Sequence, residues 1–450
     1  MSKLYEGKNF LLLEKVLSKI HHHEVKSFGA GRTDKGVHAL GQVFNFETEL
    51  DMGEKEFEKA FNSLLPSDIY VNKVNLFTQY QYNKNRVQFY AGANIDGTTM
   101  QREGHMRNGR ATYFDADGKM HDISKGKGGT AKFLGGGAKA SLVWDINGNN
   151  KLMIGGGYSQ RAPLAYNSFI APRIREDFVE GLETEGILNG EVSYALKCGA
   201  FGAKVSGFYT KINNAVQQSA FYNDAEGKFT YLTMTGVDKE HYGIEAALVY
   251  KVTSALSFNV LAALTEAEYT SNTRGSLMTE DQQELKNDRE TLYMNGAKIG
   301  GTPLTALSFG VDYNVNGWYL SANLNYYDRI YVNPSLYARL ESIAKAEGGY
   351  DEQGNPTSSI NIPSQFRGDG GFMLDASIGK SIRLRGGKQL NINLSLNNIL
   401  NNEDMVTGGY EQNRGDLNED NEKKTYVFSK NPFLYYANAF NAYLNIGLRF

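Results

Sequence analysis

The residues of this chain that could perform chemistry gather in one short segment near its start. Residues 31 to 43 read Gly-Arg-Thr-Asp-Lys-Gly-Val-His-Ala-Leu-Gly-Gln-Val, so that an arginine and a carboxylate stand two positions apart between glycines. The glycines free the backbone to present the short side chain of Asp34 at the tip of a turn, and Arg32 adds positive charge beside it. A carboxylate held in this way can act as a nucleophile. For so short a string, an ordinary polar turn with a local ion pair is the alternative.

The neighbouring residues predict a small α+β arrangement around this turn. Leu12, Val16 and Ile20 recur every four residues, as on the apolar face of a helix. Residues 42–46 alternate like a half-buried strand, and helical spacing returns over residues 52–65. The carboxylate is therefore expected on the turn that leads into this strand.

This segment resembles the tRNA pseudouridine synthases that modify uridines in the anticodon stem. The likeness rests on the run above and on Phe61-Asn-Ser-Leu-Leu-Pro-Ser-Asp-Ile-Tyr-Val, and it covers about the first 75 residues. It implies that Asp34 is the nucleophile that lets the uracil ring detach, rotate and rejoin its sugar through carbon, while Arg32 positions the flipped-out nucleotide. It also implies tRNA as a partner and a cytoplasmic location for this segment. Because the family's opening strand and later catalytic tyrosine have no counterpart here, we expect an inactive remnant.

From Leu76 onward the chain repeats a different unit, in which about ten alternating residues are followed by a turn. In the last such run, Leu444, Ile446 and Leu448 share one face, and Asn445 and Arg449 share the other. A strand with lipid on one side and water on the other needs this alternation. Two-faced runs of this kind lie at residues 86–95, 138–146, 152–159, 190–197, 203–212, 229–235, 242–252, 256–267, 307–313, 318–326, 372–382, 391–397 and 438–450.

Composition and spacing favour a membrane barrel over a soluble β-sandwich. The 450 residues include 49 Gly, 28 Tyr and 24 Phe but only 8 Pro. Short turns such as residues 145–149 alternate with long polar excursions at residues 269–295, 336–369 and 401–432. Strands of soluble sandwiches average only about five or six residues. We therefore predict a mainly β fold, a partial antiparallel transmembrane β-barrel of roughly 12–14 strands preceded by a small α+β fragment.

Several segments of this second part resemble TonB-dependent receptors, most of all the large SusC-like receptors that import glycans, peptides or metal chelates with a surface lipoprotein. The likeness runs from about Leu76 to Phe450 and implies an outer-membrane transporter that works with the TonB system, a surface lipoprotein and membrane lipid. The terminal Phe450 resembles the residue that the barrel-assembly machinery recognises. The segments that carry the likeness are Met106-Arg-Asn-Gly-Arg-Ala-Thr, Gly157-Tyr-Ser-Gln-Arg-Ala-Pro, Phe169-Ile-Ala-Pro-Arg, Gly207-Phe-Tyr-Thr-Lys-Ile-Asn-Asn, His241-Tyr-Gly-Ile-Glu and Asn391-Ile-Asn-Leu-Ser-Leu-Asn-Asn-Ile-Leu-Asn.

The two resemblances meet near Asn75 and divide the chain into residues 1–75 and 76–450. We find no match to the receptors' plug domain, TonB-contacting segment, export signal or early strands. We therefore expect an incomplete barrel that does not transport alone, because open sheet edges leave backbone groups unpaired in lipid. Three interpretations stay open: a receptor part joined to an enzyme remnant, a tRNA-modifying enzyme that relies on Asp34, and a junction created in gene calling or sequence assembly.

Charge, sulfur and histidine point to no further site. Lys and Arg number 47 against 50 Asp and Glu, so the total does not indicate nucleic-acid binding over the whole chain. Cys198 is the only cysteine, which excludes an internal disulfide framework and a cysteine-based zinc site. The run from His21 to His23 has no partner residues at ligand spacing.

Two remaining strings resemble binding loops only superficially. Residues 416–427 echo a calcium loop, but Asn421 and Val427 stand where the loop needs a glycine and a glutamate. The glycines at 126–129 and 135–137 lack the Gly-Lys-Ser/Thr that would follow them in a phosphate-binding loop, and we expect them within strands. We predict no cofactor and no metal.

Overall fold

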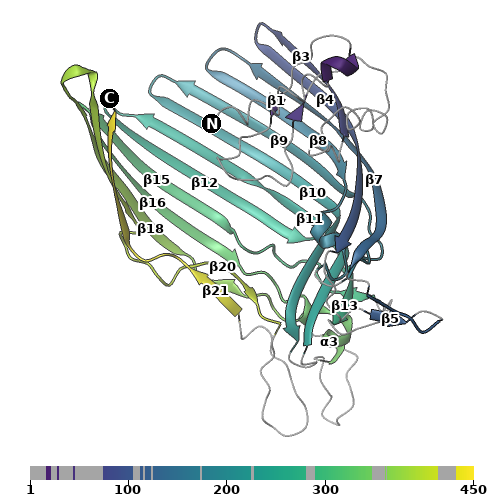
Figure 1. Cartoon of the computed structure of the whole chain (residues 1–450). Coiled ribbons are helices and arrows are strands. Elements are labelled where there is room, and N and C mark those ends of the chain that lie inside the picture. Colours follow the sequence, from purple (N-terminus) through teal and green to yellow (C-terminus); the bar gives the residue numbers. More distant parts are fainter. Residues whose placement is uncertain are drawn as a thin grey trace.

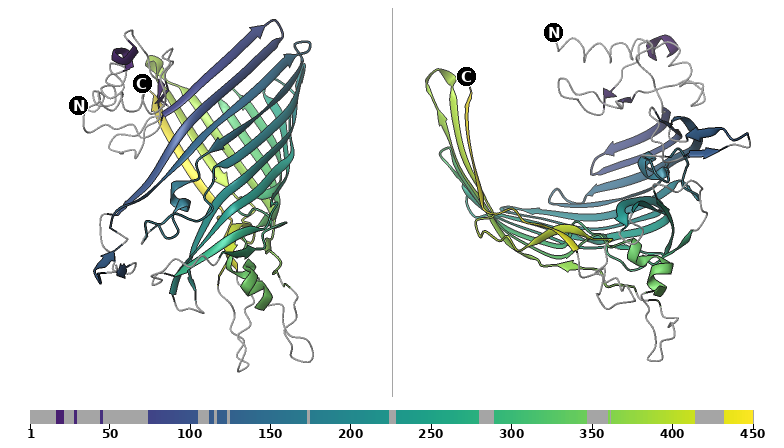
Figure 2. Two further views of the ribbon diagram at one scale, coloured as in Figure 1. Left: turned by 90° about the vertical axis from the view of Figure 1, so that its right-hand side faces the viewer. Right: turned by 60° about the horizontal axis from the view of Figure 1, so that its bottom comes forward.

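The chain builds one large antiparallel sheet, curved into an open trough. The computed structural model describes residues 17–21, 28–29, 44–45, 74–104, 112–114, 117–122, 125–172, 175–223, 228–279, 289–346, 360, 362–413 and 432–449. Thirteen strands follow one another across the sheet, from β3 at one margin to β22 at the other. Figure 1 looks into the trough, and the right panel of Figure 2 shows that its two margins do not meet. The mainly β, partial-barrel prediction is confirmed.

The strands of the sheet are long, and most connect to their neighbours along the chain. In spatial order they are β3 (Val74–Lys84), β4 (Val87–Gly104), β7 (Gly126–Asp145), β8 (Asn150–Arg161), β9 (Glu185–Cys198), β10 (Phe201–Asn223), β11 (Lys228–Lys251), β12 (Leu256–Tyr269), β15 (Pro303–Val315), β16 (Trp318–Tyr331), β18 (Gly371–Arg383), β19 (Gln389–Asn397) and β22 (Asn441–Arg449). Three shorter strands branch from this path, namely β13 (Thr273–Thr279), β14 (Glu290–Leu292) and β17 (Arg367–Gly368).

Smaller elements lie outside the sheet. Three separate strand pairs are β1 (Phe28–Gly29) with β2 (Phe44–Asn45), β5 (Thr112–Phe114) with β6 (Met120–Asp122), and β20 (Val406–Glu411) with β21 (Pro432–Tyr436). The helical elements are η1 (Ala165–Ser168), η2 (Tyr337–Arg339), α3 (Glu341–Ala346) and η3 (Arg385–Gly387), and residues 17–21 are also helical. No helix in the described part of the chain is both long and apolar enough to cross a bilayer.

The two rims of the wall differ in the length of their connections. At one rim, which we call the short-turn rim, tight turns join β3 to β4, β7 to β8, β9 to β10, β11 to β12, β15 to β16 and β18 to β19. The turn between β15 and β16 is an Asn-Gly pair with left-handed φ values of 49° at Asn316 and 78° at Gly317, as a two-residue hairpin requires. At the opposite, long-loop rim most connections are much longer, as the spacing of the turns predicts, although only four residues join β10 to β11.

Two details of the predicted strand pattern are wrong. Residues 229–235 and 242–252 were expected to form two strands, but both belong to the 24-residue strand β11. The residues between them read as polar because β11 continues beyond the apolar band of the wall, where neither face meets lipid. The sequence pattern also misses β3, which pairs with β4 along its whole length.

The described parts of the long connections at the long-loop rim share a buried apolar core. Residues from β11, β14 and η2 with their neighbours pack together there, and Leu232, Met234, Leu292, Met294 and Leu340 are fully buried. We call this group the loop-rim core. The segments 269–295 and 336–369, predicted as polar excursions, therefore contain β13, β14, η2 and α3.

A buried arginine ties several of these connections together. Arg339 donates hydrogen bonds from its guanidinium to the carbonyl oxygens of Tyr293, at 3.3 Å, and Pro363, at 3.1 Å. Burial lowers the pKa of Arg339, and the charge of Glu411 partly offsets this effect. The polar side chain therefore joins segments that lie far apart in the sequence.

Candidate functional site: the two faces of the wall

Strand register brings the alternating apolar residues onto one continuous face. At one margin Phe89 lies opposite Leu142, which lies opposite Ile154. At the other margin Leu444 lies opposite Leu394. Leu142, Ile154 and Leu444 are exposed, whereas Phe89 and Leu394 are partly buried. Ile446 in β22 retains 64% of its accessible surface. An exposed apolar face this wide indicates contact with lipid rather than water. We call it the outer face.

Aromatic rings border this apolar band at both rims. Four of them are exposed near the short-turn rim, and four more lie toward the long-loop rim. Such paired girdles are typical of barrels whose wall crosses a bilayer, because amphipathic rings prefer the two interfaces. The first group is Trp144, Tyr250, Tyr313 and Trp318, and the second is Tyr158, Tyr209, Tyr242 and Phe372.

One lysine interrupts the apolar pattern near the short-turn rim. Lys380 stands opposite Trp318 on the outer face. Its ammonium lies 4.8 Å from the centre of the Trp318 ring and donates a 2.8 Å hydrogen bond to the carbonyl of Asn316 in the turn. The charged end therefore reaches the rim while the aliphatic stem covers the wall.

Charged residues follow immediately beyond the aromatic residues at the long-loop rim. Lys211 and Glu240 form a 3.0 Å ion pair, and this hydrogen bond raises the pKa of Lys211 and lowers that of Glu240. Glu266 accepts hydrogen bonds from Lys298, at 3.0 Å, and from Arg329. Partial burial alone would raise the pKa of Glu266, but these hydrogen bonds outweigh burial and lower it. The charges mark where the lipid-facing band ends.

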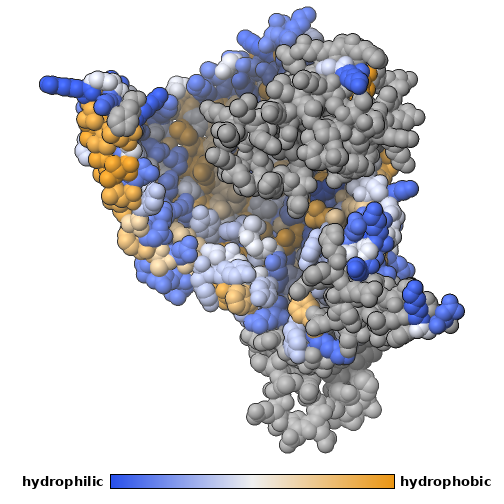
Figure 3. Space-filling view, in the orientation of Figure 1, coloured by the Kyte–Doolittle hydropathy of each residue, from blue (hydrophilic) through white to orange (hydrophobic). Residues whose placement is uncertain are grey.

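The opposite, inner face of the wall is lined mainly by amides, hydroxyls and carboxylates, with Val249 and Leu261 exposed among them. Asn259 donates to Asp312 across β12 and β15, and Asn325 donates to Asp375 across β16 and β18, each at 3.0 Å. Figure 3 shows hydrophobic residues along the outer margin at the left, and a mixture of hydrophilic residues and hydrophobic patches on the surface turned into the trough. Ser321, Ser377, Asn393, Ser395 and Asn445 lie on the same face. This face can hold water or a polar ligand.

Glycines make room for large polar side chains on the inner face. The ring of Tyr319 lies where a side chain on Gly379 of the neighbouring strand would stand. Gly310 lies between the amides of Asn259 and Asn323 in the same way. A Cβ at either position would collide with these groups, so glycine is required by close approach rather than by backbone angle.

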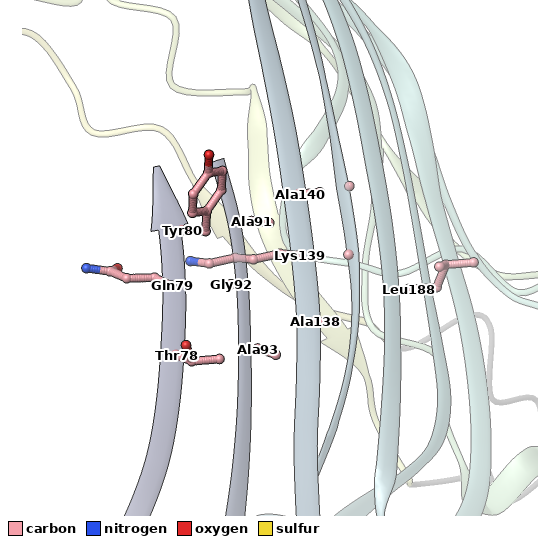
Figure 4. A pocket seen from close by; sticks show the side chains of 12 residues that line it. Thr78, Gln79, Tyr80, Ala91, Gly92, Ala93, Ala138, Lys139, Ala140 and Leu188 are labelled. Carbon is pink, nitrogen blue, oxygen red and sulfur yellow. The ribbon is translucent and has the colours of Figure 1, made fainter. Parts of the chain in front are cut away.

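A shallow hollow of about 600 Å³ interrupts the outer face near the β3 margin. Small residues such as Ala91, Ala138 and Gly156 form its floor, and Leu188 is among the residues that line it. In Figure 4 the side chains of Gln79 and Lys139 point away from the side on which Leu188 lies. The hollow therefore faces lipid and brings no catalytic groups together.

The β20–β21 hairpin lies toward the long-loop rim (Figure 1) and carries an exposed aromatic cluster. Tyr410 stacks on Phe433 with ring centres 5.3 Å apart, and Phe433 meets Tyr435 edge-on at 5.5 Å. All three rings are exposed, at 42%, 46% and 52%. We call them the aromatic cluster. It offers an exposed apolar surface at the long-loop rim.

A buried carboxylate on the other side of this hairpin holds it in place. Glu411 accepts hydrogen bonds from the backbone N–H groups of Ser335, at 2.8 Å, and Phe366, at 2.7 Å. Asn333 pairs with Tyr410 through an isolated bridge. The polar excursion predicted at residues 401–432 covers Tyr410 but ends before Phe433 and Tyr435, so the cluster was missed. The run Phe433-Leu-Tyr-Tyr was the available signal.

The residues predicted to carry chemistry lie largely outside the described residues. This holds for Arg32, Asp34 and Phe450, and also for the calcium-like string at 416–427. Cys198 is exposed at the short-turn end of β9. The glycine runs at 126–129 and 135–137 lie within β7, as expected.

The histidine run is described only at its first residue. His21 is buried, and its Nδ1 donates a 2.8 Å hydrogen bond to the carbonyl of Leu17. Within the ranges that the structure describes, no group of three or more His, Cys, Asp or Glu residues could hold a metal ion.

Comparison with curated proteins confirms the likeness to the pseudouridine synthases. The tRNA pseudouridine synthase A of Staphylococcus saprophyticus is 50% identical over 62 residues, which are 14% of this chain and 23% of that protein. The enzyme of the same name from an Exiguobacterium species is 51% identical over 61 residues, covering 14% and 25%. The chain thus spans about a quarter of the length of these relatives.

The wall resembles a solved transporter structure in fold, and the chain matches a known protein family. The structure described as copper transporter OprC has a TM-score of 0.50 and 10% identity, over 83% of this chain and 48% of that chain. This likeness shows a shared fold, and this chain spans about half of that protein. The family described as TonB dependent receptor-like, beta-barrel matches residues 18–399. Because this match covers most of the chain, and the strands have the two faces of such a barrel, the chain belongs to the TonB-dependent receptor-like β-barrel family.

Proposed function

We propose that this chain is part of an outer-membrane receptor for the active uptake of a large nutrient. Barrels of its family are outer-membrane proteins that work with the TonB system. The observation that supports this proposal is the wall itself, whose apolar outer face is bordered by aromatic residues while its inner face is mainly polar. In this arrangement the short-turn rim faces the periplasm and the long-loop rim faces the exterior.

We infer a glycan as the ligand from among glycans, peptides and metal chelates. The aromatic cluster of Tyr410, Phe433 and Tyr435 supports this choice, because the apolar faces of sugar rings pack on exposed aromatic rings. Asn and Asp side chains on the inner face supply hydrogen bonds for sugar hydroxyls. A SusC-like receptor of this kind would work with a surface lipoprotein, and Phe450 would serve as the signal for the barrel-assembly machinery.

The proposal is tested first by membrane behaviour and then by binding. The purified chain in detergent is expected to show heat-modifiable migration and a β-rich circular dichroism spectrum, and a mainly helical spectrum would contradict the proposal. In isothermal titration with a panel of soluble oligosaccharides, Tyr435→Ala is expected to weaken binding by about 1 kcal/mol, roughly fivefold. Tyr436→Ala, on the other side of the hairpin, is the matched control. Equal effects of the two variants would argue against the cluster.

A second candidate function is supported by the 50% identity to tRNA pseudouridine synthase A. We propose that residues 1–75 derive from such an enzyme, with Asp34 as its nucleophile and Arg32 positioning the target nucleotide in tRNA. The segment would then belong to the cytoplasm, whereas residues 76–450 belong to the receptor. Because the match spans only a quarter of the enzyme, we expect an inactive remnant.

Activity of this segment is measured as pseudouridine formation in tRNA. The purified chain is compared with the Asp34→Ala variant on the same unmodified tRNA substrate. We expect no product from either protein. Product that depends on Asp34 would show that the segment is an active enzyme, and a single transcript across the codon for Asn75 would exclude an artefactual junction.

A further inference from the structure

The short-turn rim carries almost only positive charge. Its six turns, with the two strand residues on either side of each turn, contain eight Lys and Arg side chains and one carboxylate, that of Asp145. Over the whole chain the two signs nearly balance, at 47 Lys and Arg against 50 Asp and Glu, so the excess belongs to this rim. The eight cations, all of them exposed, are Lys84, Arg86, Lys151, Lys197, Lys251, Arg383, Arg385 and Lys388.

Charges at the long-loop rim are arranged differently. There, cations of the wall lie beside carboxylates, as in the ion pair of Lys211 and Glu240 at 3.0 Å. At the short-turn rim the single carboxylate of Asp145 instead accepts a hydrogen bond from the backbone N–H of Gly148 in its own turn. The positive charge of the short-turn rim therefore remains in excess, and it produces a field that attracts anions.

The hairpin between β18 and β19 carries this charge at its highest density. Arg383, Arg385 and Lys388 all fall within residues 383–388. No aspartate or glutamate occurs between Asp375 and Glu403, so the hairpin contains no charge of opposite sign. An anion at the rim therefore meets the strongest attraction at this hairpin.

The outer face of the same hairpin presents apolar surface beside the charge. The backbone N–H of Leu384 donates a 2.8 Å hydrogen bond to the carbonyl of Lys388, so the register of β18 and β19 continues to these residues and places both on the outer face. Leu384 is 41% exposed, and Trp318, one strand away, is 45% exposed. The Lys380 ammonium lies 4.8 Å from the centre of the Trp318 ring. Cations thus stand beside apolar and aromatic side chains where the lipid-facing band ends.

A phospholipid headgroup combines the groups that these neighbours can bind. Its phosphate accepts charge-assisted hydrogen bonds from Lys and Arg, and its acyl chains contact the apolar wall. Anionic lipids are known to attract basic residues near a membrane surface. The cations are also spread over five of the six turns, which suits many small headgroups better than one compact protein partner.

We propose that the short-turn rim binds the phosphate groups of anionic phospholipids, most strongly at the β18–β19 hairpin. The inference rests on the proposed membrane placement, and it adds the class of lipid and the rim that binds it. It does not depend on which nutrient the receptor takes up.

The test measures which lipids surround Trp318 in a bilayer. The chain contains two tryptophans, so Trp144→Phe leaves Trp318 as the only one. The full chain in this background is folded into vesicles of phosphatidylcholine with a minor fraction of phosphatidylglycerol. Bromine is carried by the phosphatidylglycerol in one preparation and by an equal amount of phosphatidylcholine in the other. We expect quenching to show at least about fivefold enrichment of phosphatidylglycerol, the effect of one Lys or Arg near the surface.

Paired variants assign this enrichment to the hairpin. Arg385→Gln with Lys388→Gln is expected to remove most of it, whereas Arg385→Lys with Lys388→Arg keeps the charge and should keep the enrichment. The matched control is Lys127→Gln with Lys132→Gln, which removes two exposed cations at the long-loop end of β7 and should change nothing. Salt at about 1 M, which screens charges beyond about 3 Å, is expected to reduce the enrichment.

The remaining outcomes contradict the proposal. Equal quenching by the two brominated lipids, or equal enrichment in the doubly neutralised hairpin, would overturn it. Loss of the enrichment on addition of soluble polyglutamate at an equal concentration of charge would mean that the rim prefers an acidic polypeptide, and would also overturn it. Heat-modifiable migration is recorded on the same vesicles. A chain that fails to insert overturns the proposed function and this inference with it, whereas an inserted chain without enrichment overturns this inference alone.

Discussion

The wall and the loop-rim core follow opposite rules of burial within one chain. In the wall, leucines and isoleucines are exposed, and Leu444 retains 58% of its accessible surface. In the loop-rim core, Leu232, Leu292 and Leu340 are fully buried. The same residue types thus avoid water in two ways, by facing lipid and by packing against each other. Exposure of an apolar residue is informative here only together with its distance from the rim.

The largest expected effect separates these two environments. Leu292→Ala removes a packed side chain and leaves a cavity, so it is expected to cost about 2–5 kcal/mol. Leu444→Ala is expected to cost less, because lipid chains fill the vacated space and no cavity persists. Both are measured by proteolysis of the loops and by urea unfolding in phospholipid vesicles. Equal losses at the two positions would contradict the distinction between lipid contact and protein core.

A charge placed in the wall distinguishes its two faces. Ile446→Arg puts a guanidinium on the outer face and is expected to destabilise the folded barrel by about 2–4 kcal/mol in vesicles. Asn445→Arg, one residue away on the inner face, is the matched control and is expected to be nearly neutral. The urea unfolding midpoint in vesicles measures both. A larger loss for Asn445→Arg would reverse the assignment of the faces.

Ion pairs at the long-loop rim make folding stability depend on pH, and this effect is expected to be smaller than those of the two preceding substitutions. Hydrogen bonds from Lys298 and Arg329 lower the pKa of Glu266 below its ordinary value of 4.5. The stabilisation is therefore complete above pH 4.5 and is lost as the pH falls through the lower pKa of the folded state. We expect Glu266→Gln to remove up to about 1 kcal/mol of this acid-dependent stability. Unfolding measured from pH 6 downward checks it, with Glu403→Gln as the control.

The smallest expected change in stability tests the girdle at the short-turn rim. The chain contains two tryptophans, Trp144 and Trp318, and both are exposed on the outer face at that rim. Their fluorescence is expected to be quenched by bromine atoms near the lipid headgroups more than by bromine near the bilayer centre. Trp318→Phe should halve the signal and change stability by less than about 1 kcal/mol. Stronger quenching from the bilayer centre would contradict the placement of the band.

Sequence alternation predicts most of the wall and little of what lies beyond it. Runs such as residues 318–326 and 391–397 were correctly assigned as strands, because lipid and water on opposite faces impose a period of two. The pattern fails at Gly236 to His241 in β11, where both faces leave the lipid and the alternation carries no signal. It also fails for the loop-rim core, whose buried residues come from separate segments and show no local period.

The candidate functional residues also divide into those that the sequence predicts and those that depend on the fold. Arg32 and Asp34 were recognised from one contiguous run, and their roles remain predictions. The aromatic cluster depends on the register of β20 and β21, which brings Tyr410 opposite Phe433. No local pattern contains that register.

The order of amino acids along the chain is enough to predict a two-faced β wall and an unrelated segment before it. Each strand meets lipid and water through its own alternating side chains, so its pattern is local. Strand count, direction and register are not local properties. They emerge only when backbone hydrogen bonds between distant segments are satisfied. For that reason the aromatic cluster and the loop-rim core became visible only in the folded chain.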